Sequence, residues 1–92
     1  MSEYIELNAD LSDDPLVGVI ETNLKLAVDG DELYASAESL LEGSPVAQSL
    51  AGILGIAELI IEEHALIITR DPDVEWYAIV EDVSAALKDF FL

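Results

Sequence analysis

Residues 43–92 read GSPVAQSLAGILGIAELIIEEHALIITRDPDVEWYAIVEDVSAALKDFFL, and this stretch decides the fold. Each of its segments carries a start signal, a periodic apolar face and a stop signal. None of the segments has the residue pattern of an active site. This half of the chain therefore indicates a structure, while the chemistry of its single residues does not indicate a reaction.

A helix is expected over about Pro45 to Leu54. Ser44 can accept a hydrogen bond from the first free backbone amides, and Pro45 stands at the first helical position, where its missing N–H costs nothing. One face then carries apolar residues at helical spacing: Val46, Ala47, Leu50, Ile53 and Leu54. Gly55 is placed to end this helix in a left-handed conformation.

An antiparallel hairpin is expected after the helix. Its two strands are the segments rich in Ile and Leu at Ile56–Glu62 and Ala65–Arg70, which are separated by Glu63 and His64. The turn is unusual because it lacks glycine.

The longest helix is expected from Val74 to Leu92. Asp71 or Asp73 can cap it, since a carboxylate also meets the positive end of the helix dipole. Apolar residues at spacings of three and four form one stripe: Trp76, Ile79, Val80, Val83, Leu87 and Phe90. We expect this stripe to cover the sheet. Phe91 and Leu92 fall off its centre and mark either a partner contact or the edge of a longer chain.

The first half of the chain gives weaker signals. Three extended segments are expected: Tyr4–Leu7, Leu16–Glu21 and Leu24–Val28. A turn-rich stretch at Asn8–Pro15 follows the first segment, and Val17 and Val19 share one side of the second. A break is expected at Asp29–Asp31, which contains Gly30. The residues Leu33–Leu41 fit either a short helix or, at their start, the end of a strand.

The order of these segments predicts a single α+β domain over residues 1–92. We expect two layers, an antiparallel sheet of about four strands with two main helices on one face. A chain of 92 residues is too short for two separate cores without disulfides or metals. Its hydrophobic content of 52% argues against disorder despite a formal net charge of -17.

Composition excludes several functions. The chain has no cysteine, which rules out disulfides, thiolate nucleophiles and cysteine-ligated iron–sulfur clusters. Twenty acids face three Lys and Arg residues, so we expect no binding to nucleic acids or membranes, both of which attract cations. A basic protein partner is compatible with this charge. The start MSEYIELNAD lacks a signal-peptide pattern and the apolar runs are too short to span a membrane, so a cytoplasmic location is expected.

His64 is the one histidine and lies beside Glu62 and Glu63, which makes it a candidate metal ligand or general base. On a hairpin turn we expect it to be solvated and without a preset geometry. Seven serines lack the context of a nucleophile elbow, and no glycine loop is present that would hold phosphate. We therefore expect no catalytic or cofactor-binding residue, and no enzyme activity.

Asp71, Asp73 and Glu75 alternate as in the opening of a calcium-binding loop. Such a loop needs glycine at its sixth position, where this chain has Trp76. Capping of the last helix is therefore favoured, and no metal-binding residue is expected. Weak binding of divalent ions by so acidic a surface remains a separate hypothesis.

The pattern GSPVAQSLAGILGI, then the hairpin, then RDPDVEWYAIVEDVSAALKDFF resembles the N-terminal domain of Nfu/NifU-type iron–sulfur scaffold proteins. The shared features are the Ser-Pro-apolar-Ala helix start at 44–47, Gly55 with Ile56, and the pair Glu75 and Trp76. The stretch 13–15 is similar to the family's Asn-Pro turn. The match covers about half the chain. It departs from the family at 62–64, where a glycine commonly stands.

The resemblance implies a non-catalytic accessory or protein-interaction domain associated with iron–sulfur cluster assembly. Its expected partners are assembly factors or cluster-receiving proteins. Mutation of exposed acids opposite the stripe of the last helix should then weaken capture of these partners without unfolding the domain. The family's cluster-binding CxxC module is absent, so no cluster ligand and no cofactor carry over. The alternative, based on the charge, is an acidic decoy or regulatory protein that binds a basic protein partner.

Overall fold

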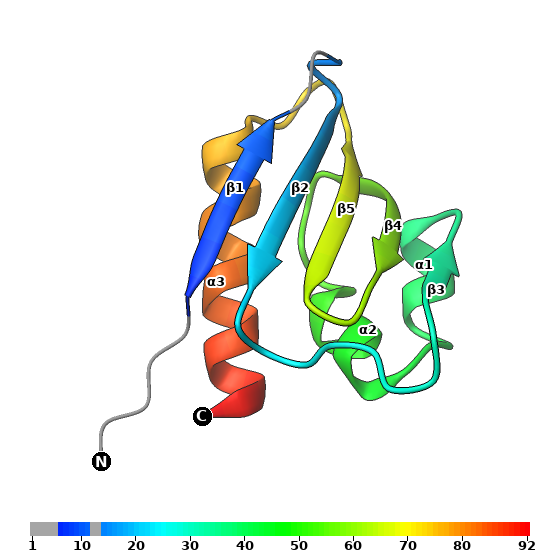
Figure 1. Cartoon of the computed structure of the whole chain (residues 1–92). Helices are drawn as coiled ribbons and strands as arrows, with labels where there is room; N and C mark the ends of the chain where they lie inside the picture. The colour runs from blue at the N-terminus through cyan, green and yellow to red at the C-terminus, as the bar shows by residue number, and fades with distance from the viewer. Residues whose placement is uncertain (1–5, 12–13) are drawn as a thin grey trace.

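The computed structural model describes residues 6–11 and 14–92 (Figure 1). In these residues the elements follow the order β1 (Leu7–Leu11), β2 (Val17–Thr22), β3 (Glu32–Tyr34), α1 (Ala37–Leu40), α2 (Pro45–Leu50), β4 (Ile56–Ile61), β5 (Ala65–Arg70) and α3 (Trp76–Phe91). The strands form one antiparallel sheet in the order β1-β2-β5-β4-β3. The helices lie on one face of this sheet and leave the other face uncovered (Figure 1). The predicted two-layer α+β class is confirmed, with five strands and three helices in the described chain.

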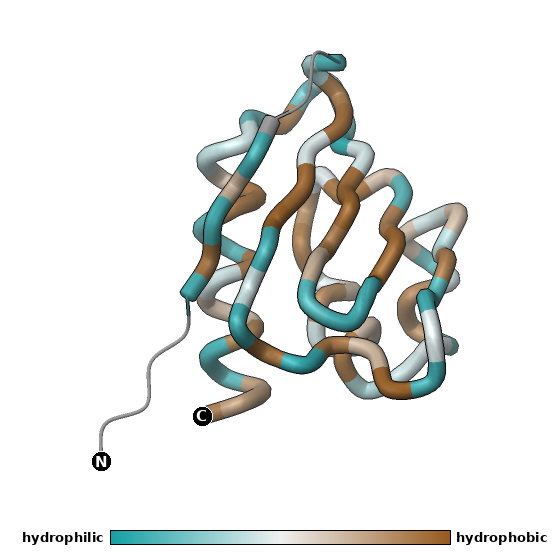
Figure 2. The backbone as a smooth tube through the Cα atoms, viewed as in Figure 1, coloured by the Kyte–Doolittle hydropathy of each residue, from teal (hydrophilic) through white to brown (hydrophobic). Residues whose placement is uncertain are grey.

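The core lies between the sheet and its helices. It is built from fully buried aliphatic side chains of the central strands, of α2 and of α3: Ile20, Leu50, Leu59, Ile61, Leu66, Ile68, Ile79, Val83 and Leu87. Each of the strands β4 and β5 nevertheless contains an uninterrupted run of large aliphatic residues, Leu59–Ile61 and Leu66–Ile68, and much of the tube of both strands is brown in Figure 2. Because successive side chains of a strand point to opposite faces, the sheet carries hydrophobic side chains on both faces.

The first strand is placed differently from the prediction. Residues 4 and 5 of the predicted strand Tyr4–Leu7 lie outside the described residues. Strand β1 occupies Leu7–Leu11, so it shares Leu7 with the prediction and continues into the stretch Asn8–Pro15 that was expected to turn. Asn8 and Asp10 are exposed. The prediction was wrong because these polar residues are tolerated on the solvent side of an edge strand.

The second segment is confirmed as β2, whereas Leu24–Val28 does not form a strand. It is a loop in which Leu26 and Ala27 are buried. The N–H of Leu26 donates to the Glu63 carbonyl at 2.7 Å, so the loop is attached to the hairpin turn by its backbone. Its apolar residues therefore serve the core without joining the sheet.

The connection that follows combines both structures expected for Leu33–Leu41. Gly30 has a φ of +108°, which confirms the break at Asp29–Asp31. The chain then forms β3 and, after one turn, the short helix α1, whose N-cap Ser36 accepts a hydrogen bond from the N–H of Ser39 at 3.3 Å.

Helix α2 begins as predicted and ends earlier. The Ser44 hydroxyl accepts from the N–H of Ala47 at 3.3 Å, and Pro45 occupies the first turn. The helix ends at Leu50 because the chain must turn back to deliver the buried Ile56 to β4. Leu54 is therefore 80% exposed, and Gly55, with a φ of +105°, leads into β4 instead of ending the helix.

The predicted hairpin is confirmed by β4 and β5, with the N–H of Glu62 donating to the carbonyl of Ala65 at 2.9 Å. The pairing register shifts between Ile56 and Glu58, which inserts Ala57 as an extra residue in β4. This bulge allows both Ile56 and Leu59 to point into the core.

Helix α3 begins two residues later than predicted, and neither aspartate caps it. Its N-cap is Glu75, which makes no side-chain cap hydrogen bond. The Asp71 carboxylate instead accepts from the N–H of Asp73 at 2.9 Å, which closes the turn before the helix. The stripe also ends differently, because Phe91 packs against the core while Phe90 is 42% exposed. Within the described residues, no helix is long and apolar enough to cross a membrane.

Candidate interaction surface

Four apolar side chains line up across the uncovered face of the sheet. The strand register pairs Val19 with Ile67, Ile67 with Ile60, and Ile60 with Leu33. Residues directly opposite in an antiparallel pair point to the same face. Because Ile20, Leu59 and the other neighbours in sequence point into the core, these four face away from the helices. We call them the apolar row.

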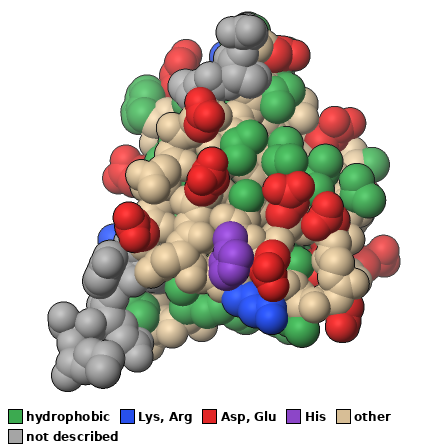
Figure 3. Space-filling view, viewed as in Figure 1, with side chains coloured by type: hydrophobic (Ala, Val, Ile, Leu, Met, Phe, Trp, Pro, Cys, Tyr) green, Lys and Arg blue, Asp and Glu red, His purple; other side chains and the backbone are tan. Residues whose placement is uncertain are grey.

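Carboxylates surround the apolar row. Asp10 on β1 pairs with Val19 and so ends the row at the edge of the sheet. On one side of the row, Glu58 stands opposite Thr69, and on the other side Glu21 stands opposite Ala65. Figure 3, which looks onto this face, shows acidic side chains among and around the hydrophobic ones. The surface therefore combines an apolar centre with a negative rim.

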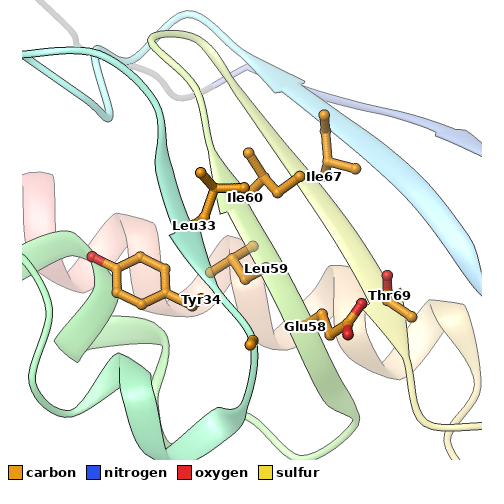
Figure 4. A pocket seen from close by; sticks show the side chains of 8 residues that line it. Leu33, Tyr34, Glu58, Leu59, Ile60, Ile67 and Thr69 are labelled. Carbon is orange, nitrogen blue, oxygen red and sulfur yellow. The ribbon is translucent and has the colours of Figure 1, made fainter.

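The row is hollowed where it approaches β3. A cleft of about 270 Å³ is lined there by Leu33, Ile60 and Ile67, with Glu58 and Thr69 in the neighbouring row (Figure 4). Leu33 is 75% exposed, while the two isoleucines are half-buried. A contiguous apolar surface with a polar rim is typical of a site that binds another macromolecule.

The sequence itself contains a signal for this surface. Leu59–Ile61 and Leu66–Ile68 are uninterrupted apolar runs. An antiparallel strand with one face in water alternates apolar and polar residues, whereas a continuous run is typical of strands that are covered on both faces. The two runs therefore indicate a sheet with a second hydrophobic face.

A second, larger groove lies between β1 and α3. It has a volume of about 780 Å³ and is lined by apolar residues that include Leu7, Trp76 and Val80. Glu81 and Lys88 bring charges of both signs to its wall. The groove therefore lacks the single sign of charge that the uncovered sheet face has.

Arg70 and Trp76 form a clamp that sequence reasoning missed. The Arg70 guanidinium donates to the carbonyls of Pro15 and Val74, each at 2.9 Å, and to those of Asp71 and Pro72, each at 3.2 Å. Its central carbon lies 5.9 Å from the centroid of the Trp76 ring, and the indole N–H donates to the Pro15 carbonyl at 2.9 Å. Both side chains therefore hold the fold together at the start of α3.

His64 is exposed on the hairpin turn, as expected, but its ring is held in place. Its Nδ1 lies 2.7 Å from the carbonyl oxygen of Leu24, and its Nε2 lies 3.9 Å from a Glu63 carboxylate oxygen. Lys25 approaches the other Glu63 oxygen at 3.6 Å. Within residues 6–11 and 14–92, no three His, Asp or Glu side chains converge to hold a metal ion, and this includes Asp71, Asp73 and Glu75.

Comparison with known proteins gives similarity in structure alone. No protein-family model and no curated protein sequence matches the chain. The solution NMR structure of a NifU-like protein from Saccharomyces cerevisiae superposes with a TM-score of 0.75 at 18% identity, over 97% of this chain and 82% of that one. The chain has the fold of a NifU-like protein. The crystal structure of protein SAV1430 from Staphylococcus aureus also superposes on this chain, with a TM-score of 0.68 at 10% identity, over 89% of this chain and 98% of that one.

Proposed function

We propose that the chain is a non-catalytic accessory domain of the Nfu N-terminal type, which binds protein partners in cytoplasmic iron–sulfur cluster assembly and does not ligate a cluster. The NifU-like fold supports the biological context. The absence of cysteine supports a role other than cluster binding. The observation that carries the proposal is the apolar row on the uncovered face of the sheet.

The energetics of the apolar row favour binding. Burying a large aliphatic side chain contributes about 1.5 to 3 kcal/mol. The side chains on the uncovered face stay partly exposed to water in the folded chain, so part of this free energy is not gained on folding. A partner that covers Leu33, Ile60 and Ile67 recovers it on association. The partners we propose are assembly factors or cluster-receiving proteins.

Affinity capture from a native lysate tests the biological context. The full chain should retain iron–sulfur assembly factors or cluster-receiving enzymes, and the Leu33→Ser variant should retain less of them, because Leu33 is the most exposed member of the apolar row. Quantitative mass spectrometry compares the two. Retention of unrelated proteins alone, in equal amounts by both chains, would contradict the proposal.

Cluster reconstitution tests the proposal that the chain does not ligate an iron–sulfur cluster. The chain is incubated anaerobically with ferrous iron, sulfide and a thiol, then desalted. We expect the visible absorbance of a cluster to be absent from the protein fraction, since the chain offers no thiolate. A stoichiometric, chain-bound cluster would overturn the non-ligating role.

The second candidate function is an acidic decoy that occupies the nucleic-acid site of a basic protein. Its support is the net charge of -17. A complex held by such charges alone should dissociate between low and moderate salt. Binding through the apolar row should lose only part of its affinity, because salt does not screen the burial of aliphatic side chains, so the size of the salt dependence of a captured complex separates the two functions.

A further inference from the structure

We infer that the uncovered face of the sheet binds a basic amphipathic α-helix of a protein partner. The inference deepens the proposed function and rests on its statement that the chain binds proteins. It specifies the site, the secondary structure of the occupant and the sign of its charge.

The saturated backbone of the sheet argues for a helical occupant. The residues of the apolar row lie within strand ladders, and those of the central strands β2, β5 and β4 are paired on both sides. The face therefore offers side chains and no backbone partners. A segment buried on it must satisfy its own N–H and C=O groups. An α-helix does so internally, whereas an extended peptide needs a free sheet edge.

The length of the apolar row fits a short helix. Neighbouring strands lie about 4.8 Å apart, so four side chains on four strands span about 14 Å. A helix of about ten residues is about 15 Å long. Apolar residues at i, i+3, i+4 and i+7 of such a helix form a stripe that matches the row.

The rim selects the charge of the occupant. Asp10, Glu21 and Glu58 flank the row, and neither the row nor the residues paired beside it include Lys or Arg. The chain's own cations lie outside the apolar row and its rim. Lys25 approaches Glu63, Arg70 donates to backbone carbonyls, and Lys88 lies on α3. Lys or Arg on both sides of the partner's apolar stripe would complement these carboxylates.

The same charges disfavour a second copy of the chain as the occupant. Two copies joined through this face would bring like-charged rims together, and each copy carries a net charge of -17. Like charges that are placed directly opposite destabilise an interface. The partner is therefore a different protein.

A designed peptide tests the inference. The probe is a synthetic helix of about 14 residues, with leucines in one stripe and lysines on both sides of it, long enough to cover the row. A scrambled peptide of the same composition and a version with Glu in place of Lys are the controls. Each is titrated into the isotope-labelled full chain and followed by NMR.

We expect saturable shifts at Val19, Ile60 and Ile67 with the Leu/Lys peptide and weak or no shifts with either control. Shifts confined to Tyr77 and the groove between β1 and α3 would overturn the inference. So would equal binding of the scrambled peptide, or a dimer of the free chain that light scattering detects and that Leu33→Ser dissociates.

Matched variants test the two parts of the surface. Leu33→Ser should weaken binding of the Leu/Lys peptide about tenfold, because one large side chain no longer becomes buried. Leu54→Ser is the control, since the Leu54 side chain is about as exposed as that of Leu33, at 80% against 75%, and lies in the loop before β4. Its affinity should not change. Equal losses in the two variants would contradict binding at the row.

The rim is tested by charge removal. The double variant Glu21→Gln and Glu58→Gln should weaken binding several-fold and reduce its salt dependence. Asp82→Asn with Asp89→Asn removes the same charge from exposed positions on α3 and should change neither. A stronger effect of the α3 pair would move the contact to the helix side and overturn the inference.

The peptide experiment and the lysate experiment distinguish a failure of this inference from a failure of the proposed function. If the peptide does not bind the row while the full chain still captures assembly proteins, the inference falls and the proposed function stands. If the peptide binds the row but the lysate yields unrelated partners, the surface is correct and the iron–sulfur context is wrong.

Discussion

At Gly55, both the backbone conformation and the neighbouring atoms restrict which residue can stand there. Its φ is +105°, and its carbonyl accepts a hydrogen bond from the N–H of Asp71 at 2.7 Å. A Cβ at this position would lie 2.7 Å from Cγ1 and 2.8 Å from Cβ of Val74. We expect Gly55→Ala to lower the free energy of unfolding by about 2 to 4 kcal/mol, because both the conformation and the contact oppose it. Urea denaturation measures the change.

Gly52 provides the control for this substitution. It lies three residues earlier, and a Cβ there would meet no atom within 4 Å. Gly52→Ala should change the free energy of unfolding by less than about 1 kcal/mol, and in the stabilising direction, because alanine restricts the unfolded chain. Equal losses in the two variants would show that the position of Gly55 is not special.

At the scale of elements, the Arg70 clamp connects the turn before β2, the end of β5 and the start of α3. A lysine keeps the charge but cannot donate to carbonyls in several directions from a planar group. We expect Arg70→Lys to destabilise the fold by about 1 to 3 kcal/mol in urea denaturation. Lys25→Arg exchanges the same residue types at an exposed ion pair and should stay within about 0.5 kcal/mol. If Arg70→Lys left the free energy of unfolding unchanged, the clamp would contribute no stability.

Elements with local signals could be predicted from the sequence. Ser44 and Pro45 define the start of α2, and the apolar runs on both sides of Glu63 define the hairpin. In each case the residues that determine the structure lie within a few positions of it. The α+β class follows from the order of such elements.

Elements that depend on distant partners could not be predicted. Nothing near Asn8 and Asp10 indicates a strand, because pairing with β2 creates β1. Leu26 and Ala27 have the composition of a strand, but they are buried in a loop whose Leu26 N–H bonds to the Glu63 carbonyl of the hairpin turn, a partner distant in the sequence. Helix α2 ends where the chain must turn back to enter β4, and the local helix propensity of the sequence does not indicate this position.

The candidate surface depends on the register of five strands, which explains why residue motifs missed it. Val19, Ile60, Ile67 and Leu33 are far apart in the sequence, and only the ladder places them in one row. Their types carry no chemistry that a motif search would recognise. The two unbroken apolar runs in β4 and β5 are the part of the signal that a sequence contains.

At the scale of the whole molecule, like charge opposes folding. The formal net charge is -17, and the exposed Glu63 takes part in the ion pair with Lys25 that the described residues contain. Raising the NaCl concentration from about 0.02 to about 0.5 M should therefore raise the Tm, because salt screens the repulsion. A gain of about 1 kcal/mol corresponds to about 4 to 8 °C in a domain of this size.

Differential scanning calorimetry measures this increase. KCl at equal ionic strength should produce the same shift, since screening depends on ionic strength and not on the identity of the cation. A Tm that falls with salt would show that attraction between charges, and not repulsion, dominates the folded state.

Because helices cover only one face of the sheet, the strand positions fall into two sets that evolution can change separately. Side chains that point to the helices, such as Ile20 and Leu66, determine whether the chain folds, because they fill the core. Their neighbours on the same strands, such as Val19 and Ile67, project from the opposite surface. Substitutions in this second set can exchange one partner for another while the core stays intact, so a lineage can acquire new recognition without first acquiring a new fold.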